Sequence, residues 1–372
     1  MYNNFTRFKI FAFDVANRLK ELIRSFSFNV LKTKYDSIKD KFKDLKGTNW
    51  DLAQYHFMAG NFNDGIMRFK MLQRSGYKVM EGNYFLGRIY MEKENYANAK
   101  KYLSLYLESN QQEYRIEADY CMSIINNQVI SSVPLSIIRQ KRDRLALTLD
   151  NAKIDQALLM RYYIIITALK SQVNTPLKVL EVGCYVGIFG RMFRECFQTI
   201  TQYYSGTEIG DKSAKVAQEM HIDNTLVYDN IKTCTDISDI AKDDNSYSLI
   251  IIPDIIRYFG DLMVLFIQIF ASLQDNGITA FVFRIIKSEK EFKFSHMCTE
   301  NQNTGIQILK IENADVGDEV TSDEIEKIFI GVIEEFCHSP HYIESEARSC
   351  GFNVKMSVLM PGDFALFVLQ KP

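Results

Sequence analysis

The feature that most constrains the fold is a change of pattern at residue 177. From there on, short runs rich in β-branched residues alternate with helical segments, as expected of a parallel α/β sheet. The runs expected to form its parallel strands are Lys178–Val182, Gln202–Glu208, Asn224–Tyr228, Ser248–Ile252 and Ile278–Phe283.

The end of the chain has a different pattern. Two further apolar runs, Asn353–Leu359 and Phe364–Leu369, are separated only by the turn Pro361-Gly362-Asp363. Strands joined by so short a turn must be antiparallel. Five parallel strands followed by an antiparallel hairpin do not match the layout of a dinucleotide-binding Rossmann domain.

A glycine-rich turn follows the first strand, in the segment Leu180-Glu181-Val182-Gly183-Cys184-Tyr185-Val186-Gly187. The carboxyl edge of an open α/β sheet is where ligands bind, and glycines allow the backbone to turn and to approach a ligand closely. A dinucleotide fingerprint would require glycine at positions 183, 185 and 188. The chain has Tyr185 and Ile188 there, so that motif is excluded.

Acidic residues follow or close the next strands. Glu208 closes the second expected strand, Asp229 follows the third and Asp254 follows the fourth. A carboxylate at the end of the second strand can accept hydrogen bonds from two hydroxyl groups of one ligand at once. These positions predict a ligand site at one edge of the sheet.

Together, these segments resemble class I S-adenosylmethionine-dependent methyltransferases. The resemblance implies a Rossmann-like α/β fold, a seven-stranded sheet with an antiparallel C-terminal hairpin, and S-adenosylmethionine as cofactor. It assigns the glycine turn to the methionine part and ribose, Glu208 to the ribose hydroxyls and Asp229 to the adenine. The departure from the family pattern is Tyr185, where many members have glycine. The cofactor-binding residues implied are Glu181, Gly183, Cys184, Tyr185, Gly187, Glu208, Ile209, Asp229, Asn230 and Asp254.

A narrower resemblance is to bacterial predicted methyltransferases that carry tetratricopeptide repeats. It rests on the spacing Asp254-x-x-x-Tyr258-x-Gly260-Asp261-Leu262, and on Cys337-His338-Ser339 with Tyr342 and Gly351-Phe352 further on. It extends over about 50–107 and 177–372.

Methyl transfer needs an aligned acceptor and a group that removes its proton. The candidate catalytic residues are Tyr258, beside the cofactor motif, and His338, before a helix expected over Tyr342–Ser349. His296 and His341 are weaker candidates. Structural roles for both leading residues, a pocket wall for Tyr258 and helix positioning for His338, remain open.

The segment 50–107 contains an internal repeat with an offset of 34 residues, the tetratricopeptide period, in which each unit is a helix–turn–helix. The matches pair Ala53 with Gly87, Asn61 with Asn95, Phe62 with Tyr96, Gly65 with Ala99 and Phe69 with Leu103. A degenerate third helix pair is expected over 111–126, with a helix at Arg115–Ile125. A partner-binding surface and a helical buttress are equally consistent with this all-α region.

Four regions are therefore expected: a basic amphipathic helical leader at 1–49, a tetratricopeptide-like domain at 50–130, a linker and helix at 131–176, and the methyltransferase domain at 177–372. Residues 127–150 read as a connector with a strongly basic run at Arg139–Arg144, and a helix is expected over 153–171. A polar insertion at 287–330 is interpreted as a lid over the acceptor site, with a surface excursion as the alternative.

Charge and cysteine usage limit the partners. The net charge of −2 gives no general case for nucleic acid, although residues 1–46 hold eleven Lys and Arg against five Asp and Glu. This leader either contacts an anionic membrane surface or packs on its own protein. The seven cysteines form no zinc-type pattern, and no signal peptide, membrane span or metal site is recognised. We expect a cytoplasmic protein, with peripheral contact at the inner membrane left open.

The sequence therefore favours a cytoplasmic, bacterial-type transferase that methylates an oxygen or nitrogen of a small molecule or a glycan. A protein acceptor recruited by the helical repeats is the second hypothesis. A degenerate, non-catalytic scaffold is the third.

Overall fold

The computed structural model describes residues 44–148, 156–173, 176–234, 239, 246–286, 292–297, 333–360 and 362–372. The predicted leader therefore lies outside the described residues up to position 43. Of the predicted lid at 287–330, only the backbone of 292–297 is described.

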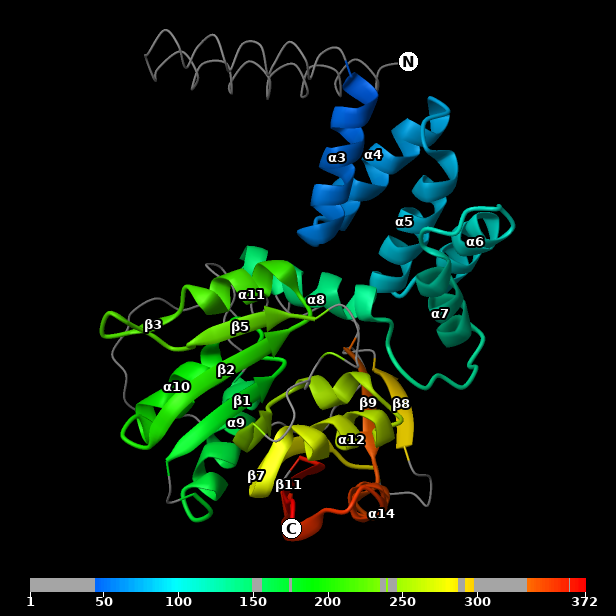
Figure 1. The fold of residues 1–372 in the computed structure, drawn as a ribbon. Coiled ribbons are helices and arrows are strands. Elements are labelled where there is room, and N and C mark those ends of the chain that lie inside the picture. Colours follow the sequence, from blue (N-terminus) through cyan, green and yellow to red (C-terminus); the bar gives the residue numbers. More distant parts are fainter. Residues whose placement is uncertain are drawn as a thin grey trace, which may run out of the picture.

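Residues 45–125 form an array of five helices, which we call the helical array (Figure 1). Its first helix pair begins at Leu45 and Phe62, and its second pair begins at Val79 and Tyr96, so equivalent helices start 34 residues apart (79 − 45 and 96 − 62). The helices are α3 (Leu45–Met58), α4 (Phe62–Arg74), α5 (Val79–Glu92), α6 (Tyr96–Leu107) and α7 (Arg115–Ile125).

Small residues set the spacing between these helices. A Cβ on Gly87 would lie 2.6 Å from Cγ of Leu103, so α5 and α6 touch where glycine removes the side chain. The only tryptophan, Trp50, is buried edge-on against Phe69 and Phe85, with ring centroids 5.4 and 5.6 Å away. Such edge-to-face pairs add to the stabilisation from apolar burial.

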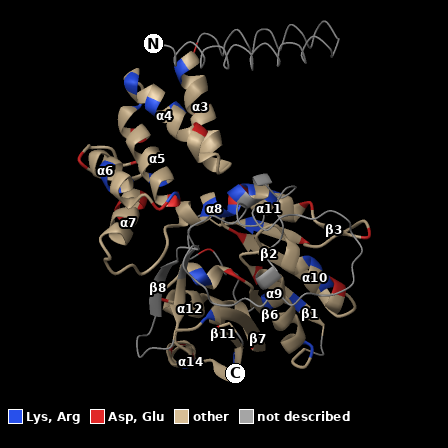
Figure 2. Cartoon of the chain, turned by 180° about the vertical axis from the view of Figure 1, so that it is seen from behind, with Lys and Arg blue, Asp and Glu red and all other residues tan. Residues whose placement is uncertain are grey.

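Two helices connect the helical array to the sheet. The connector predicted at 127–150 is wrong in part, because α8 spans Leu135–Thr148. The helix predicted over 153–171 is confirmed as α9, Gln156–Leu169. In Figure 1, α8 lies between the array and one edge of the sheet, and Figure 2 shows Lys and Arg along it.

The C-terminal part is built on a seven-stranded sheet in the order β10-β11-β7-β6-β1-β2-β5. Five strands are parallel, whereas β11 runs antiparallel to both β7 and β10. The predicted mixed sheet with its C-terminal hairpin is therefore confirmed, and the fold is Rossmann-like. The strands are β1 (Leu177–Val182), β2 (Thr201–Glu208), β5 (Asn230–Thr233), β6 (Tyr247–Ile252), β7 (Leu273–Arg284), β10 (Asn353–Met360) and β11 (Phe364–Gln370).

Helices cover both faces of this sheet. Side chains of α9, α10 (Ile188–Phe197) and α11 (Asp211–Gln218) form one buried cluster with alternate strand residues such as Val179 and Ile251. The other strand residues, such as Leu180 and Ile250, belong to the cluster that contains α12 (Met263–Ser272) and α14 (Pro340–Ser349). This alternation is the period of two expected of a strand buried on both faces.

The prediction for the third parallel strand was wrong. Asp223 and Asn224 have positive φ angles of 47° and 71°, and they turn the chain between β3 (His221–Ile222) and β4 (Thr225–Leu226). The strand that pairs with β2 is β5, which begins at Asn230. Asp229 therefore precedes the third parallel strand instead of following it.

A further pair of strands was not predicted. β8 (Phe292–Met297) pairs antiparallel with β9 (Ile333–His338), which leads directly into α14. Ser339 caps α14 by accepting a hydrogen bond from the backbone N–H of Tyr342, and Pro340 takes the first turn, where no N–H is needed. Among the helices that the structure describes, none combines the length and apolar character needed to cross a membrane.

Candidate active site

The predicted turn lies where the order of the strands reverses. The chain proceeds from β1 to β2 and β5 on one side and to β6 and β7 on the other, and ligands bind at such a switch point. Gly183 and Gly187 both have positive φ angles, 77° and 88°, and Gly187 precedes the first residue of α10. A Cβ on Gly183 would lie 2.8 Å from Cβ of Ile255, so this glycine also allows close packing against the loop after β6.

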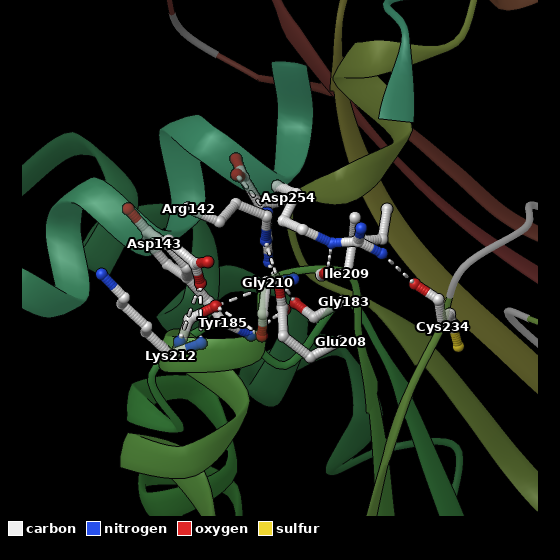
Figure 3. Close-up of polar contacts among 12 residues, drawn as sticks. Arg142, Asp143, Gly183, Tyr185, Glu208, Ile209, Gly210, Lys212, Cys234 and Asp254 are labelled. Carbon is white, nitrogen blue, oxygen red and sulfur yellow. Dashed lines mark hydrogen bonds and ion pairs between the residues drawn. The ribbon is translucent and has the colours of Figure 1, made fainter. Parts of the chain in front are cut away.

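Glu208 ends β2 at this edge, as predicted, and its carboxylate is surrounded by donors (Figure 3). Oε1 accepts hydrogen bonds from Nε of Arg142 at 2.6 Å, the N–H of Gly210 at 3.0 Å and the hydroxyl of Ser213 at 3.3 Å. Oε2 accepts from Nη2 of Arg142 at 3.0 Å and from the N–H of Tyr185 at 2.6 Å. The single proton of the Ser213 hydroxyl can instead point to the carbonyl oxygen of Gly210 at 3.2 Å, but a carboxylate offers about four lone-pair directions, so the four N–H donors alone leave none for a ligand.

Arg142 comes from α8, outside the sheet, and points into the edge. Besides its two bonds to Glu208, its Nη2 donates to the carbonyl oxygen of Gly183 at 2.8 Å, and its Nη1 lies 3.8 Å from a carboxylate oxygen of Asp254. Its side chain is 1% exposed. Burial by itself would lower the pKa of Arg142, but Glu208 raises it well above its ordinary value, so the guanidinium is charged.

Tyr185 covers this arginine. Its φ angle of 56° is unusual for a bulky residue, and its ring centroid lies 4.5 Å from Cζ of Arg142. Burial raises the pKa of the Tyr185 hydroxyl, so the phenol is neutral. The residue that departs from the family pattern thus stacks on the arginine that occupies the edge.

Asp254 follows β6 on the other side of the switch point. It lies near three arginines: Arg257 at 3.3 Å, Arg161 at 3.7 Å and Arg142 at 3.8 Å. Burial by itself would raise the pKa of Asp254, but these three charges lower it below its ordinary value. Asp254 therefore stays ionised and helps to balance the positive charge of the edge.

Glu181 does not lie at the open edge. Its carboxyl group is fully buried below the glycine turn, where Oε2 accepts hydrogen bonds from the hydroxyls of Tyr204 at 2.6 Å and Tyr228 at 2.8 Å. Burial raises its pKa to about 8, although both tyrosine hydrogen bonds act in the opposite direction. At neutral pH, Glu181 is a neutral acid that supports the turn from beneath.

The residues predicted for the adenine are at the wrong end of their strand. Asp229 bonds to the backbone N–H of Tyr204 and pairs with Arg194, both at 2.7 Å, and Asn230 is level with Ser205. The edge that carries the glycine turn lies at the opposite end, where Glu208 is level with Thr233. The assignment of Asp229 and Asn230 to the cofactor is therefore corrected, because the preceding hairpin displaces the third strand along the chain.

Other predicted cofactor residues are close to the turn but enclosed. The side chain of Cys184 is 1% exposed, and its backbone N–H donates to the carbonyl of Thr207. Ile209 is also 1% exposed, and its carbonyl oxygen accepts a hydrogen bond from Nε of Arg139 at 2.9 Å.

The two candidate catalytic residues have different surroundings. Tyr258 lies in a short 3-10 helix, Ile255–Tyr258, and is 9% exposed. His338 is completely buried, its ring nearly parallel to that of Tyr342, and its Nε2 lies 2.8 Å from the carbonyl oxygen of Phe259.

Burial lowers the pKa of His338 to about 4, so its ring is neutral and weakly basic. This geometry favours a role in holding the loop beside Tyr258 over a role as base. Of the weaker candidates, His341 is exposed on α14, and the side chain of His296 lies outside the described residues.

Sequence reasoning missed the contribution of α8. Three of its residues reach the sheet edge: Arg139 donates to the carbonyls of Ile209 and Cys234, Arg142 binds Glu208, and Asp143 accepts from the backbone N–H groups of Lys212 and Ser213 at the start of α11. Positions 139, 142 and 143 share one face of a helix. This spacing was the sequence signal for the three residues, but it can be recognised only if a helix is already expected in this highly charged segment.

Within the ranges that the structure describes, no three His, Cys, Asp or Glu side chains are grouped so that they could hold a metal ion.

Comparisons with known proteins find similarity only among solved structures. No protein-family model matches the chain. A search of curated proteins finds no match either.

Many solved structures are similar to part of the chain at low identity. An S-adenosylmethionine-dependent methyltransferase from Mesorhizobium loti is 14% identical over 55% of this chain and 96% of its own, with a TM-score of 0.37. The 1,6-didemethyltoxoflavin-N1-methyltransferase of Burkholderia thailandensis is 10% identical over 65% and 93%, with a TM-score of 0.42. The magnesium protoporphyrin IX methyltransferase of Synechocystis is 13% identical over 64% and 99%, with a TM-score of 0.40.

Proposed function

We propose that residues 177–372 form an S-adenosylmethionine-dependent methyltransferase domain of class I. The observation that carries the proposal is the strand order, with β11 inserted antiparallel between β7 and β10, together with a glycine turn at the switch point. Glu208, at the end of the neighbouring strand, supports the same assignment, because a carboxylate there suits a ribose diol.

Within this reaction class we favour an oxygen or nitrogen of a small molecule or a glycan as the methyl acceptor. Tyr258 and Asp254, on the other side of the switch point, are both largely buried. An edge enclosed in this way is better suited to a small group than to an extended polymer surface.

The edge residues as arranged do not fit the cofactor. All the acceptor directions of Glu208 are used by protein donors, so the ribose hydroxyls would find no partner there. In this arrangement Arg142 holds the two oxygens that a ribose diol would need.

The test is binding of the demethylated cofactor, S-adenosylhomocysteine, to the full chain by isothermal titration calorimetry. We expect saturable binding of one equivalent, weakened at least tenfold by Glu208→Ala. The variant Glu195→Ala, which removes an exposed carboxylate on α10, is the control and should bind like the wild type. Absence of binding at millimolar ligand, in both the wild type and a variant that frees Glu208, would contradict the proposal.

The second candidate is a non-catalytic scaffold, and the saturated carboxylate of Glu208 favours it. The helical array provides a further argument, because its 34-residue offset is typical of tetratricopeptide units that bind partners. However, part of its surface is already engaged by α8, since Arg88 bonds to Gln140, and Arg144 bonds to the carbonyl of Phe57. These contacts support a buttress more than a free groove for a protein substrate.

A further inference from the structure

The cofactor edge contains a side chain that can imitate part of the ligand. The fork of Arg142 gives two parallel hydrogen bonds to the two oxygens of Glu208, at 2.6 and 3.0 Å. A ribose diol would present its two hydroxyl donors to the same two oxygens. Arginine and the diol are therefore alternative partners of one carboxylate, and they cannot bind it together.

The helix that carries this arginine, α8, is held by contacts on two of its faces. On one face, Arg139, Arg142 and Asp143 bind the sheet edge; on another, Gln140 and Arg144 bind the helical array. Arg144 donates to carbonyl oxygens at the end of α3 and lies 3.5 Å from a buried carboxylate oxygen of Glu92. The position of α8 is thus determined jointly by the array and by the edge.

Tyr185 adds a second independent element. A glycine would adopt a φ angle of 56° without strain, whereas a tyrosine there costs conformational energy. Its ring lies over the guanidinium of Arg142, and its backbone N–H completes the set of donors around Glu208. The unusual turn residue and the unusual arginine therefore stabilise the same closed arrangement.

We propose that Arg142 is an internal plug that competes with the cofactor for Glu208, and that the helical array holds α8 in the plugged position. This inference rests on the proposed function, because it concerns regulation of the same site. Cofactor binding then requires Arg142 to leave Glu208, and the apparent affinity is reduced by the fraction of molecules that are closed. A site that is open in about one molecule in ten binds about tenfold more weakly than a site that is always open.

The experiment compares S-adenosylhomocysteine binding by calorimetry in four full-length proteins. These are the wild type, Arg142→Met, Tyr185→Gly and the control Arg194→Met, which removes an arginine paired with a carboxylate at the opposite end of the sheet. We expect Arg142→Met to bind at least tenfold more tightly than the wild type, Tyr185→Gly to bind more tightly by a smaller factor, and the control to stay within about twofold. Tyr185→Gly relieves the strained φ angle, so it keeps the test valid if Arg142→Met does not fold.

The other outcomes separate the two proposals. Equal binding by the wild type and both edge variants would overturn the plug and leave the methyltransferase proposal intact. Weaker binding by both edge variants would overturn the plug as well, because Arg142 and Tyr185 would then contribute to the ligand site. No binding by any folded variant at millimolar ligand would overturn the proposed function and the plug together.

Coupling to the array is read from Arg144→Met, which keeps Arg142 but removes an anchor of α8 on α3. We expect Arg144→Met to bind the ligand more tightly than the wild type does. In the wild type, ligand binding should change the fluorescence of Trp50, since Trp50 lies in α3. Unchanged affinity in Arg144→Met would show that the array does not hold the plug.

Discussion

The buried acid below the glycine turn leads to a sharp prediction about pH. Glu181 is fully buried and its pKa is raised to about 8, whereas the same side chain in the unfolded chain ionises near 4.5. Between these values the folded protein keeps a proton that the unfolded chain releases. Stability is therefore greatest at low pH for this group and falls as the pH rises through the window from about 4.5 to 8.

The substitution Glu181→Gln isolates this effect. A glutamine oxygen can accept both tyrosine hydroxyls, from Tyr204 and Tyr228, as the neutral acid does. The amide nitrogen then replaces Oε1, which has no hydrogen-bond partner among the described residues. We therefore expect the variant to lose no more than about 1 kcal/mol at pH 5.5, where the acid is neutral in the folded protein.

The two proteins should diverge as the pH rises. One proton of difference changes the free energy of unfolding by about 1.4 kcal/mol per pH unit, so the wild type should lose about 2 to 3 kcal/mol relative to Glu181→Gln between pH 5.5 and 7.5. Above about pH 8 the difference should level off, because Glu181 is ionised in both states.

Urea unfolding followed by circular dichroism, at four pH values from 5.5 to 8.5, measures this difference. Comparing variants cancels the titration of all other groups. As a control, Glu195→Gln alters a half-exposed carboxylate and should run parallel to the wild type. Parallel curves for Glu181→Gln as well would refute the reasoning, since they would place the pKa of Glu181 near its ordinary value.

Three other variants test the remaining structure. The pKa of His338 is lowered to about 4, so as the pH falls the unfolded chain binds a proton at this histidine before the folded protein does. Stability should therefore fall as the pH drops from about 6.5 to 4. His338→Gln should reduce this loss, measured as thermal unfolding at about pH 5 relative to about pH 7.5. Gly87→Ala places a methyl group against Leu103 and should cost about 1 to 3 kcal/mol, measured through Trp50 fluorescence in urea; no loss would contradict the close packing of α5 on α6. Asp143→Ala removes the cap of α11 and should cost about 1 kcal/mol in urea, with Asp143→Asn losing less.

Most strands of the sheet could be predicted from the sequence, since β1, β2, β6 and the terminal hairpin appear within about two residues of their predicted bounds. β1, β6 and β11 are buried, continuous apolar runs, whereas β10 is a largely exposed edge strand that was located through the short turn joining it to β11. The start of β7 was missed by five residues, since the polar residues Gln274–Asn276 are exposed and interrupt the apolar run after Leu273. The helix at Arg115–Ile125 was predicted with its observed bounds.

The third strand could not be found in this way because β5 is a short strand at the edge of the sheet. Three of its four residues are exposed, so its sequence, Asn-Ile-Lys-Thr, carries no apolar run. The apolar residues of Leu226–Tyr228 offered a stronger signal, but Asp223 and Asn224 form the turn of a short hairpin whose second strand includes Leu226. The error moved Asp229 to the wrong edge, and with it one of the predicted cofactor contacts.

The candidate site was predicted only where it belongs to the sheet. Glu208, Asp254 and the glycine turn lie at the expected edge, because strand order places them there. α8 escaped detection for a physical reason: the side chains it buries include charged groups, Arg142 and Asp143, that are matched by Glu208 and by helix N–H groups. Hydrophobic periodicity detects helices that bury an apolar face, and it gives little signal for α8, which buries Arg142 and Asp143 as well as Ile137 and Ile138.

The buried charge of Arg142 also explains why the tyrosine at position 185, in the glycine turn, is linked to α8. A buried arginine is tolerated only when its charge and donors are matched, and here the matching groups are Glu208, the carbonyl of Gly183 and the ring of Tyr185. A glycine at position 185 would leave the guanidinium uncovered, and a neutral residue at position 142 would leave a tyrosine strained for no gain. The tyrosine in the glycine turn and the arginine of α8 therefore form one feature of this chain, and either alone would be less stable than the pair.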